Sequence, residues 1–478
     1  MRNSTTAAGH QGLGAETFAR VEELLGTAIR RARGAGAPVL LSACAPTDEV
    51  VDPAALLAGS RRPGEHWFCF EQPDREGSAL AALGCVRALQ ASGPGRFGAV
   101  NAGWRALVHD ALCHPSDGPQ GSGLVAHGGF AFAPAGGGSR RWAGFEPGSL
   151  VIPELSLARH GHRSWLTANL EVAPDDTADD LRGRLRRRLG ELRPRPLPIV
   201  DPAPVGAYEV VSPMPPAHYE EAVSRAVQRI RAGELEKIVL AREVEVHAPV
   251  AHDPAAVFGL LREAFSSSFV FAVGRGDATF VGASPELLVR REGQRASTVA
   301  LAGSTRRSAD PAVDDHLGEA LLHSEKDREE NAVVARRIAR ALRPHSVWVA
   351  VAPEPSLVKV ANIQHLACPI RAQLASAVDA VELAALLHPT PAVGAEPASA
   401  LALIPALEGL DRGWYAGPVG WTDAVGDGEF CVALRSALLR DRVACCYSGC
   451  GIMGDSDPAS ELAESELKLQ VMLPALAG

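Results

Sequence analysis

Strands that follow one another through tight turns constrain the fold of this chain most, because such strands pair antiparallel. Residues 269–273 and 278–281 flank the turn sequence Gly-Arg-Gly-Asp and predict a hairpin. Further strands are expected at 37–44, 237–246, 287–290, 347–351, 430–439 and 443–448. Apolar periodicity and stop signals predict helices at 16–33, 218–232, 324–342 and 458–473. These patterns predict an α/β (α+β) protein whose mainly antiparallel sheets are flanked by helices.

The pattern of predicted secondary structure changes near the middle of the chain. Residues 1–14 are typical of a disordered leader, and residues 15–205 are loop-rich. Within that part, 115–149 is rich in Gly, Pro and Ser and is expected to form a long loop around one short strand at 128–134. A Pro-studded stretch at 193–216 precedes residues 206–478, where strands and helices alternate clearly.

Charge and composition exclude several classes of partner. A net charge of −9 argues against nucleic acid, and the one arginine cluster, at 182–188, follows four aspartates and is balanced by them. No run of about 18 apolar residues suggests a membrane span, and the N-terminus lacks the apolar middle of a secretory signal. The 9 scattered cysteines are typical of reduced thiols, so a cytoplasmic protein is expected.

Two predicted helices carry carboxylates where a buried stripe is expected. Val334, Ile338 and Leu342 define the stripe of the helix at 324–342, and Glu330 and Asp327 extend it towards the N-terminus. Both carboxylates could instead favour the positive helix end, with Ser324 as the N-cap.

The last helix repeats this arrangement. Glu461, Glu464 and Lys468 share one stripe, although an exposed salt-bridged face would look the same. Two such carboxylate pairs would suit a hard cation such as Mg²⁺, which prefers oxygen ligands.

Lys237 and Glu286 are candidates for a base and an acid. Lys237 opens a strand that is apolar on both faces, and burial lowers the pKa of a lysine, making its neutral amine available as a base. Glu286 lies in the turn GASPELLVR, where burial would raise the pKa of its carboxyl and let it act as an acid. A lysine at a strand end that reaches water and an ordinary turn carboxylate are the alternatives.

Nine sequence blocks stand in order along the chain: EKIVLAR (236–242), FVGASPELLVR (280–290), ALAGSTRR (300–307), SEKDREENAVV (324–334), NIQHL (362–366), HPTPAVGA (388–395), DRGWYAGPVGW (411–421), CVALRSAL (431–438) and SGCGIMGDSDPASELAESELKL (448–469). In this order they resemble the chorismate-utilising enzymes, and among them the isochorismate synthases of salicylate-derived siderophore pathways. The resemblance is strong over about 205–478 and looser before it. It implies one integrated unit of layered, mostly antiparallel sheets wrapped by helices, with 206–478 as the chorismate-binding catalytic region.

The resemblance also implies an isomerase reaction in which water adds to ring carbon 2 of chorismate while the hydroxyl leaves carbon 4. Lys237 would activate the water, and Glu286 would protonate the departing hydroxyl. Glu330 and Glu464 would bind Mg²⁺ directly, whereas Asp327 and Glu461 would reach it through water.

The substrate's carboxylates have implied partners as well. Arg435, Lys468 and the backbone around Gly449 would contact them, helped by Gly303, Ser304 and His365. For His365, a core histidine bonded to backbone is the alternative. Relatives often carry histidine in place of Glu329 and glycine in place of Ala395, so local geometry can differ there.

Related activities remain as alternatives. A salicylate synthase would go on to expel pyruvate, but such enzymes typically carry threonine where this chain has Ala392. Amine-transferring relatives usually have glutamine in place of Lys237 and draw ammonia from a glutamine amidotransferase subunit, which is not expected here. A non-catalytic chorismate-binding homologue is the third alternative, and for the oligomeric state a monomer or a dimer is expected.

Overall fold

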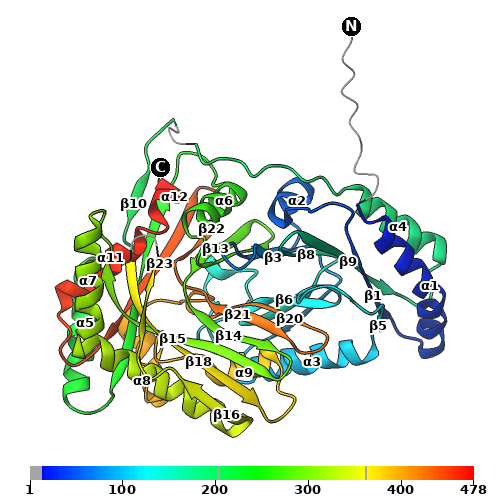
Figure 1. Ribbon diagram of the computed structural model, residues 1–478. Helices are drawn as coiled ribbons and strands as arrows, with labels where there is room; N and C mark the ends of the chain where they lie inside the picture. The colour runs from blue at the N-terminus through cyan, green and yellow to red at the C-terminus, as the bar shows by residue number, and fades with distance from the viewer. Residues whose placement is uncertain (1–12, 202–204, 361–362, 478) are drawn as a thin grey trace.

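Antiparallel pairing dominates the computed structural model, which describes residues 13–201, 205–360 and 363–477 (Figure 1). Most of the expected leader, residues 1–12, lies outside the described residues. The larger sheet has 13 strands, in the order β10 (Glu209–Val211), β11 (Lys237–His247), β23 (Val443–Ile452), β22 (Ser436–Arg440), β13 (Ala278–Ser284), β12 (Phe269–Arg275), β2 (Trp67–Gln72), β3 (Ser78–Leu83), β8 (Leu155–His160), β9 (Arg163–Val172), β1 (Val39–Pro46) and β5 (Leu112–Cys113), with β19 (Ala395–Glu396) beside β11.

The second sheet has 10 strands and also combines strands from both halves of the chain. Its order is β16 (Ser346–Val351), β18 (Ile363–Leu374), β15 (Arg295–Arg306), β14 (Leu287–Glu292), β21 (Gly428–Val432), β20 (Pro418–Asp423), β6 (Val125–Phe130), β7 (Gly148–Ile152) and β4 (Arg87–Ala91), with β17 (Ser356–Lys359) beside β18. Among the described residues, β1 and β5 form a parallel pair and the other pairs are antiparallel. The expected fold class is therefore confirmed.

Helices cover the outer faces of the two sheets. They are α1 (Ala15–Ala35), α2 (Pro53–Ser60), α3 (Arg96–Asp110), α4 (Ala178–Gly190), α5 (Pro216–Arg231), α6 (Pro254–Ala264), α7 (Pro311–His323), α8 (Glu325–Leu342), α9 (Ala380–Leu387), α10 (Leu403–Glu408), α11 (Pro458–Leu469) and α12 (Leu473–Ala477), with short 3-10 helices at Arg140–Trp142, Arg343–His345 and Ala398–Ala402. α8 and α9 pack on the smaller sheet, whereas α5 and α11 pack on β11 and β23.

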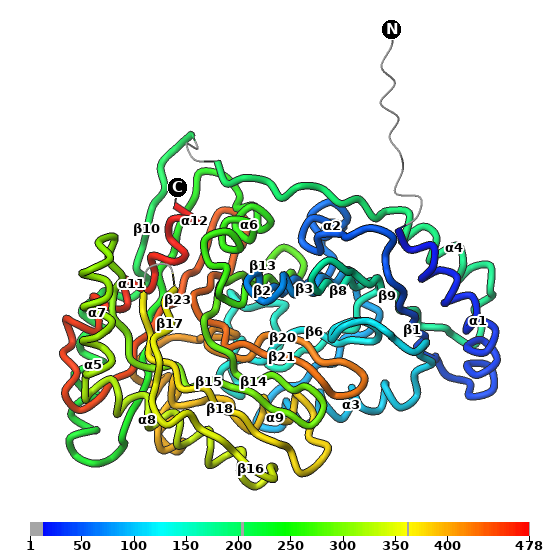
Figure 2. Tube along the Cα trace, in the orientation of Figure 1, coloured from blue at the N-terminus to red at the C-terminus, as the bar shows by residue number. Residues whose placement is uncertain are grey.

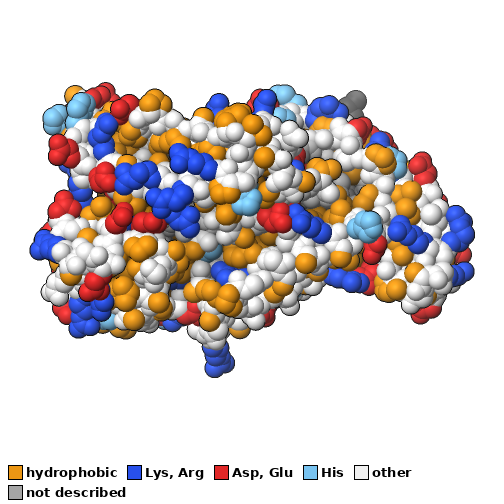
Figure 3. All heavy atoms as spheres, turned by 90° about the horizontal axis from the view of Figure 1, so that it is seen from below, with side chains coloured by type: hydrophobic (Ala, Val, Ile, Leu, Met, Phe, Trp, Pro, Cys, Tyr) orange, Lys and Arg blue, Asp and Glu red, His pale blue; other side chains and the backbone are white. Residues whose placement is uncertain are grey.

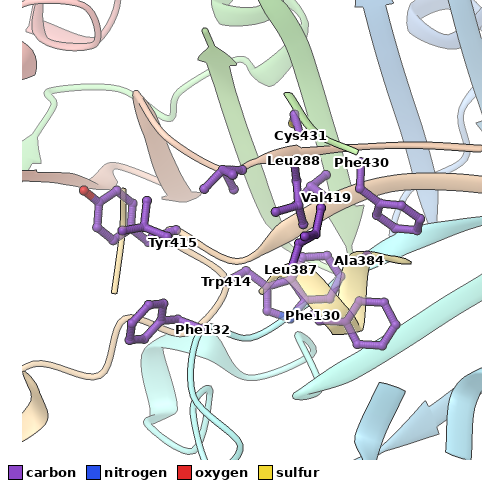
Figure 4. Packing of buried hydrophobic residues seen from close by; sticks show 14 of the residues in the cluster. Phe130, Phe132, Leu288, Ala384, Leu387, Trp414, Tyr415, Val419, Phe430 and Cys431 are labelled. Atoms are coloured by element: carbon purple, nitrogen blue, oxygen red, sulfur yellow. The ribbon is translucent and has the colours of Figure 1, made fainter. Parts of the chain in front are cut away.

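Alternating side chains of the larger sheet supply two cores. Along β12, Phe271 and Val273 join the core between the sheets, and Val270 and Ala272 join the core beneath α1, α2 and α6. This is the period of two that a strand buried on both faces requires. Figure 4 shows Phe130 and Trp414 of the first core beside Leu387 of α9.

One expected strand proves to be two. The segment at 430–439 divides into β21 and β22, which belong to different sheets. The chain crosses between them at Arg435, whose φ of 49° is in the left-handed region that no strand can contain. Apolar residues on both sides of the crossing hide the break from a pattern of hydrophobicity.

The last helix and the N-terminal part also differ from expectation. The helix predicted at 458–473 ends at Leu469, and α12 begins at Leu473. The strand in the long loop is β6, which ends at Phe130. Residues 15–201 contain β1–β9 and α1–α4. This part of the chain therefore has much more regular secondary structure than the loop-rich sequence predicted. The Pro-rich stretch passes over α2, where the Arg195 N–H donates to the Ala55 carbonyl at 2.9 Å (Figure 2).

The charges on the surface and the state of the cysteines are those of an ordinary globular protein. Within the described ranges, every helix is too short or too polar to cross a bilayer. Acidic and basic side chains alternate on the face in Figure 3. In the arginine cluster, Arg182 pairs with Glu22 and Asp179, but Arg188 is buried against Glu65 and Glu154, so that face is only partly solvated. The cysteines are free, and most of them are buried.

Candidate active site

A cavity of about 840 Å³, counting its opening, lies where β11, β23, α8 and α11 meet the crossing at Arg435. Every site residue predicted from the sequence except Lys237 lines it: Glu286, Gly303, Ser304, Asp327, Glu330, His365, Ala392, Arg435, Gly449, Glu461, Glu464 and Lys468. These residues are spread over 183 positions of the chain (286 to 468), so the fold and not local sequence brings them together.

Lys237 lies just behind the cavity wall. Its side chain is 0% exposed, and its Nζ is 2.7 Å from Glu330 Oε1, an ion pair whose angles are not those of a hydrogen bond. The alternative in which Lys237 lies at a strand end and reaches water is therefore ruled out. Gly451 of β23 makes this contact possible, since a Cβ there would stand 2.2 Å from Glu330 Oε1 and 2.9 Å from Lys237 Cε.

Glu286 is held in a rigid turn between the two sheets. Its N–H donates to Ser284 Oγ at 3.2 Å, and its carbonyl accepts from the Val432 N–H at 3.0 Å. Burial raises the pKa of its carboxyl to about 8, although the charges of Lys237 and Arg435 act to lower it. At neutral pH the group therefore carries a proton that it can donate.

Arg435 and His365 form a buried pair in the wall. Arg435 Nη2 donates to His365 Nε2 at 3.2 Å, and the ring also bonds the backbone of Gly303. Burial, with the charges of Arg435 and Lys468, holds the pKa of His365 well below its usual range, so the ring is neutral. The histidine is thus bonded to backbone, as the alternative required, and also orients the guanidinium.

Gly303 itself has a φ of +82°, and a Cβ there would approach Asp327 Cβ to 2.9 Å. The close packing of β15 against the first turn of α8 therefore requires glycine at this position.

The carboxylate pairs come from the first two turns of two capped helices, with Asp327 and Glu461 in the first turns and Glu330 and Glu464 in the second. Ser324 caps α8 by accepting from the Asp327 N–H, and Asp457 caps α11 by accepting from the Ser460 N–H at 2.9 Å. Asp327 therefore takes part in the N-cap of α8 through its backbone N–H and also lines the cavity. Glu461 is only 4% exposed, so this stripe of α11 is not an exposed salt-bridged face.

Burial and mutual repulsion act on these carboxylates. Burial raises the pKa of Asp327, and Glu330 and Glu464 raise it further. Burial also raises the pKa of Glu461, and Glu464 adds to the effect. A cation among them would relieve both effects.

Two lysines meet the carboxylates from either side. Lys468 Nζ lies 2.6 Å from Glu464 Oε1 and donates to the Gly449 carbonyl at 3.0 Å. Burial opposes the charge on Glu464, but the Lys468 charge and hydrogen bond outweigh it and lower the pKa of this carboxyl. Lys326 Nζ is 3.5 Å from Glu461 Oε1.

The donor set is that of a hard cation. Cys450 Sγ also lies within 4.8 Å of the Glu461 and Glu464 oxygens, but burial raises the pKa of this thiol far above neutrality. It therefore stays protonated and is a poor ligand. The carboxylates of Asp327, Glu330, Glu461 and Glu464 line the same cavity, and such oxygens suit a hard divalent cation.

Sequence reasoning missed several residues of the wall, notably Arg412, Tyr415, Lys326 and Gly451. Arg412 is buried, forms an ion pair with Glu408 and donates to the Val239 carbonyl at 2.9 Å. The block DRGWYAGPVGW contained two of these residues, but its spacing indicates no chemistry without the cavity.

Comparison with known proteins shows the family to which the chain belongs. A family model described as "Chorismate binding enzyme" matches residues 27–477. The "Salicylate biosynthesis isochorismate synthase" of Pseudomonas aeruginosa is 38% identical over 454 residues, covering 94% of this chain and 93% of that protein.

Two solved structures are similar as well. The menaquinone-specific isochorismate synthase MenF from Escherichia coli has a TM-score of 0.74 at 25% identity, covering 95% of this chain and 99% of that one. A putative 2,3-dihydroxybenzoate-specific isochorismate synthase, DhbC, from Bacillus anthracis has a TM-score of 0.69 at 28% identity, covering 87% and 97%. Because the family model spans almost the whole chain and the Pseudomonas relative matches along nearly its full length, this protein belongs to the chorismate binding enzyme family.

Proposed function

We propose that the protein is an isochorismate synthase that converts chorismate to isochorismate. The observation that carries the proposal is the buried Glu286, whose pKa burial raises to about 8, in the wall of the cavity behind which the buried Lys237 lies. Relatives named isochorismate synthases, one of them for salicylate biosynthesis, support both the activity and a role in supplying salicylate.

In the proposed mechanism, Lys237 acts as its neutral amine, not as the cation paired with Glu330, and takes a proton from water as the water oxygen bonds to ring carbon 2. The double bonds of the ring shift, and the bond between carbon 4 and its hydroxyl breaks. Glu286 gives its proton to that hydroxyl, which leaves as water. One water enters and one leaves, so the reaction is an isomerisation.

Arg435 and Lys468 are proposed to hold the two carboxylates of chorismate. A guanidinium fixed by His365 can meet a carboxylate through two parallel hydrogen bonds. Glu330 and Glu464 would hold Mg²⁺ directly, with Asp327 and Glu461 bound through water. When bound, the ion would supply positive charge that anchors the ring carboxylate.

Product formation is expected to fall as the pH rises through about 8, where Glu286 loses its proton. Unfolded, this carboxyl titrates near 4.5, so its raised folded pKa makes the protein progressively less stable from about pH 4.5 to 8. Glu286→Gln should lack this contribution and be more stable than the wild type at pH 9. Rate profiles and thermal unfolding at several pH values test both expectations, and an unchanged rate up to pH 9.5 would contradict the acid role.

The product itself is predicted from Ala392, whose methyl offers no hydrogen-bond donor to the cavity. We expect isochorismate to accumulate in equilibrium with chorismate, with little salicylate. Ala392→Thr adds a hydroxyl that could steady the enolpyruvyl group for elimination, so pyruvate release should become measurable while isochorismate output slows. Chromatography with a coupled pyruvate assay distinguishes the products. Stoichiometric salicylate and pyruvate from the wild type would instead identify a salicylate synthase.

A further inference from the structure

Arg275, the last residue of β12, is a buried cation to which the described residues supply no counter-ion. Its side chain is nearly inaccessible, with 4% of the residue exposed. Nη1 donates to the carbonyl of Gly274 at 3.0 Å, but Nη2 has no hydrogen-bond partner among the described residues. Burial lowers the pKa of the guanidinium to about 10, so it remains charged at neutral pH.

Two histidines of the N-terminal part stand near this guanidinium. β2 pairs with β12 so that Trp67 lies opposite Gly274, which places His66 next to Arg275. His127 comes from β6 in the facing sheet and is 0% exposed, with its ring stacked on Phe68 at 4.6 Å. In the part of the chain that the structure describes, neither ring nitrogen of His127 has a partner, nor has Nδ1 of His66.

Both histidines are neutral and can donate. Burial, with the charge of Arg275, lowers the pKa of His66 to about 4 and holds that of His127 well below its usual range. Each neutral ring carries one N–H. His66 and His127 therefore offer two imidazole N–H donors beside the guanidinium of Arg275.

Cys85 is an acidic group whose charge would act on Arg275, but it does not serve as a counter-ion. Burial raises the pKa of its thiol, although Arg275 acts to lower it. The thiol is therefore protonated at neutral pH. Among the described residues, no carboxylate forms an ion pair with Arg275, which contrasts with Arg412 and Arg188, each buried against a glutamate.

We propose that Arg275, His66 and His127 bind a small monovalent anion, of the size of chloride, between the two sheets. Leaving a guanidinium buried without a partner is strongly destabilising, and water alone would satisfy its N–H groups without offsetting its charge. An anion accepts from all three side chains and supplies the missing charge. It would also join β12 of the catalytic half to β2 and β6 of the N-terminal part.

Bromide is the direct probe, because it replaces chloride and scatters anomalously. In crystals of the wild-type protein soaked in bromide, we expect an anomalous peak in contact with Arg275 Nη2 and the His127 ring. A density at this position without anomalous signal at saturating bromide would overturn the proposal, because it would identify water. This measurement needs no variant and does not depend on catalytic activity.

Thermal unfolding provides the matched test in solution. Replacing gluconate by chloride at constant ionic strength should raise the midpoint of the wild type, because the anion binds the folded state. Arg275→Met should lose this chloride-dependent rise while still forming isochorismate. Arg225→Met removes an exposed arginine that pairs with Glu221 and should keep the full rise. Equal chloride dependence in Arg275→Met and the wild type would contradict the site.

Discussion

Removing divalent metal with EDTA is expected to abolish isochorismate formation, and adding back Mg²⁺ should restore it. Glu330→Gln and Glu464→Gln should each reduce turnover by about a thousandfold or more, since a bound metal contributes several kcal/mol of charge stabilisation. The physical reason is that each glutamine keeps the shape of the side chain but removes the charged oxygen that a hard cation requires. Mg²⁺ titration by calorimetry measures the loss of metal binding independently of turnover.

Neighbouring glutamates on the same helices provide controls. Glu329 on α8 and Glu466 on α11 are each 58% exposed, and they pair with Arg336 and Arg242. Glu329→Gln and Glu466→Gln should therefore bind Mg²⁺ and turn over like the wild type. Full activity of the wild type in metal-free buffer would refute the four-carboxylate site, and equal losses in the control variants would show a general effect of charge.

Lys237→Ala and Glu286→Gln are each expected to slow turnover by at least about 100-fold, the usual size of a general acid–base contribution. Lys237→Ala removes the amine that accepts the proton of water, and Glu286→Gln removes the proton given to the departing hydroxyl. Both variants should still bind chorismate, because Arg435 and Lys468 are unchanged. Calorimetry with chorismate and single-turnover kinetics separate binding from chemistry.

A lysine outside the cavity is the control for this pair. Lys359 pairs with the buried Asp314 and the exposed Asp315, and Lys359→Ala should leave turnover unchanged. Near-normal turnover of Lys237→Ala would rule out its role as the base. Because Lys237 also pairs with Glu330, the Mg²⁺ affinity of Lys237→Ala should be measured too, so that a changed metal site is not mistaken for a lost base.

Local patterns in the sequence predicted the elements that carry the site. The four-residue recurrence of Val334, Ile338 and Leu342 correctly placed Glu330 and Asp327 on the cavity side of α8, because a helix repeats every 3.6 residues. The hairpin at β12 and β13 and the caps at Ser324 and Asp457 are likewise local, since a turn or a cap involves residues a few positions apart. The strand pattern already made Lys237 a candidate base, whereas the roles of Arg435 and Lys468 came from the family resemblance.

Tertiary structure alone decided how these elements meet. The contact of Lys237 with Glu330 joins residues 93 positions apart (330 − 237), and it depends on a glycine at 451 that no pattern singled out. The crossing at Arg435 is flanked by apolar residues on both sides, and the buried Arg275 looks in the sequence like an ordinary hairpin residue. Hydrophobic periodicity records which side of an element is buried, but it does not record the partner. Partners, burial and the pKa of Glu286 arise only when strands from both halves pair in the same two sheets.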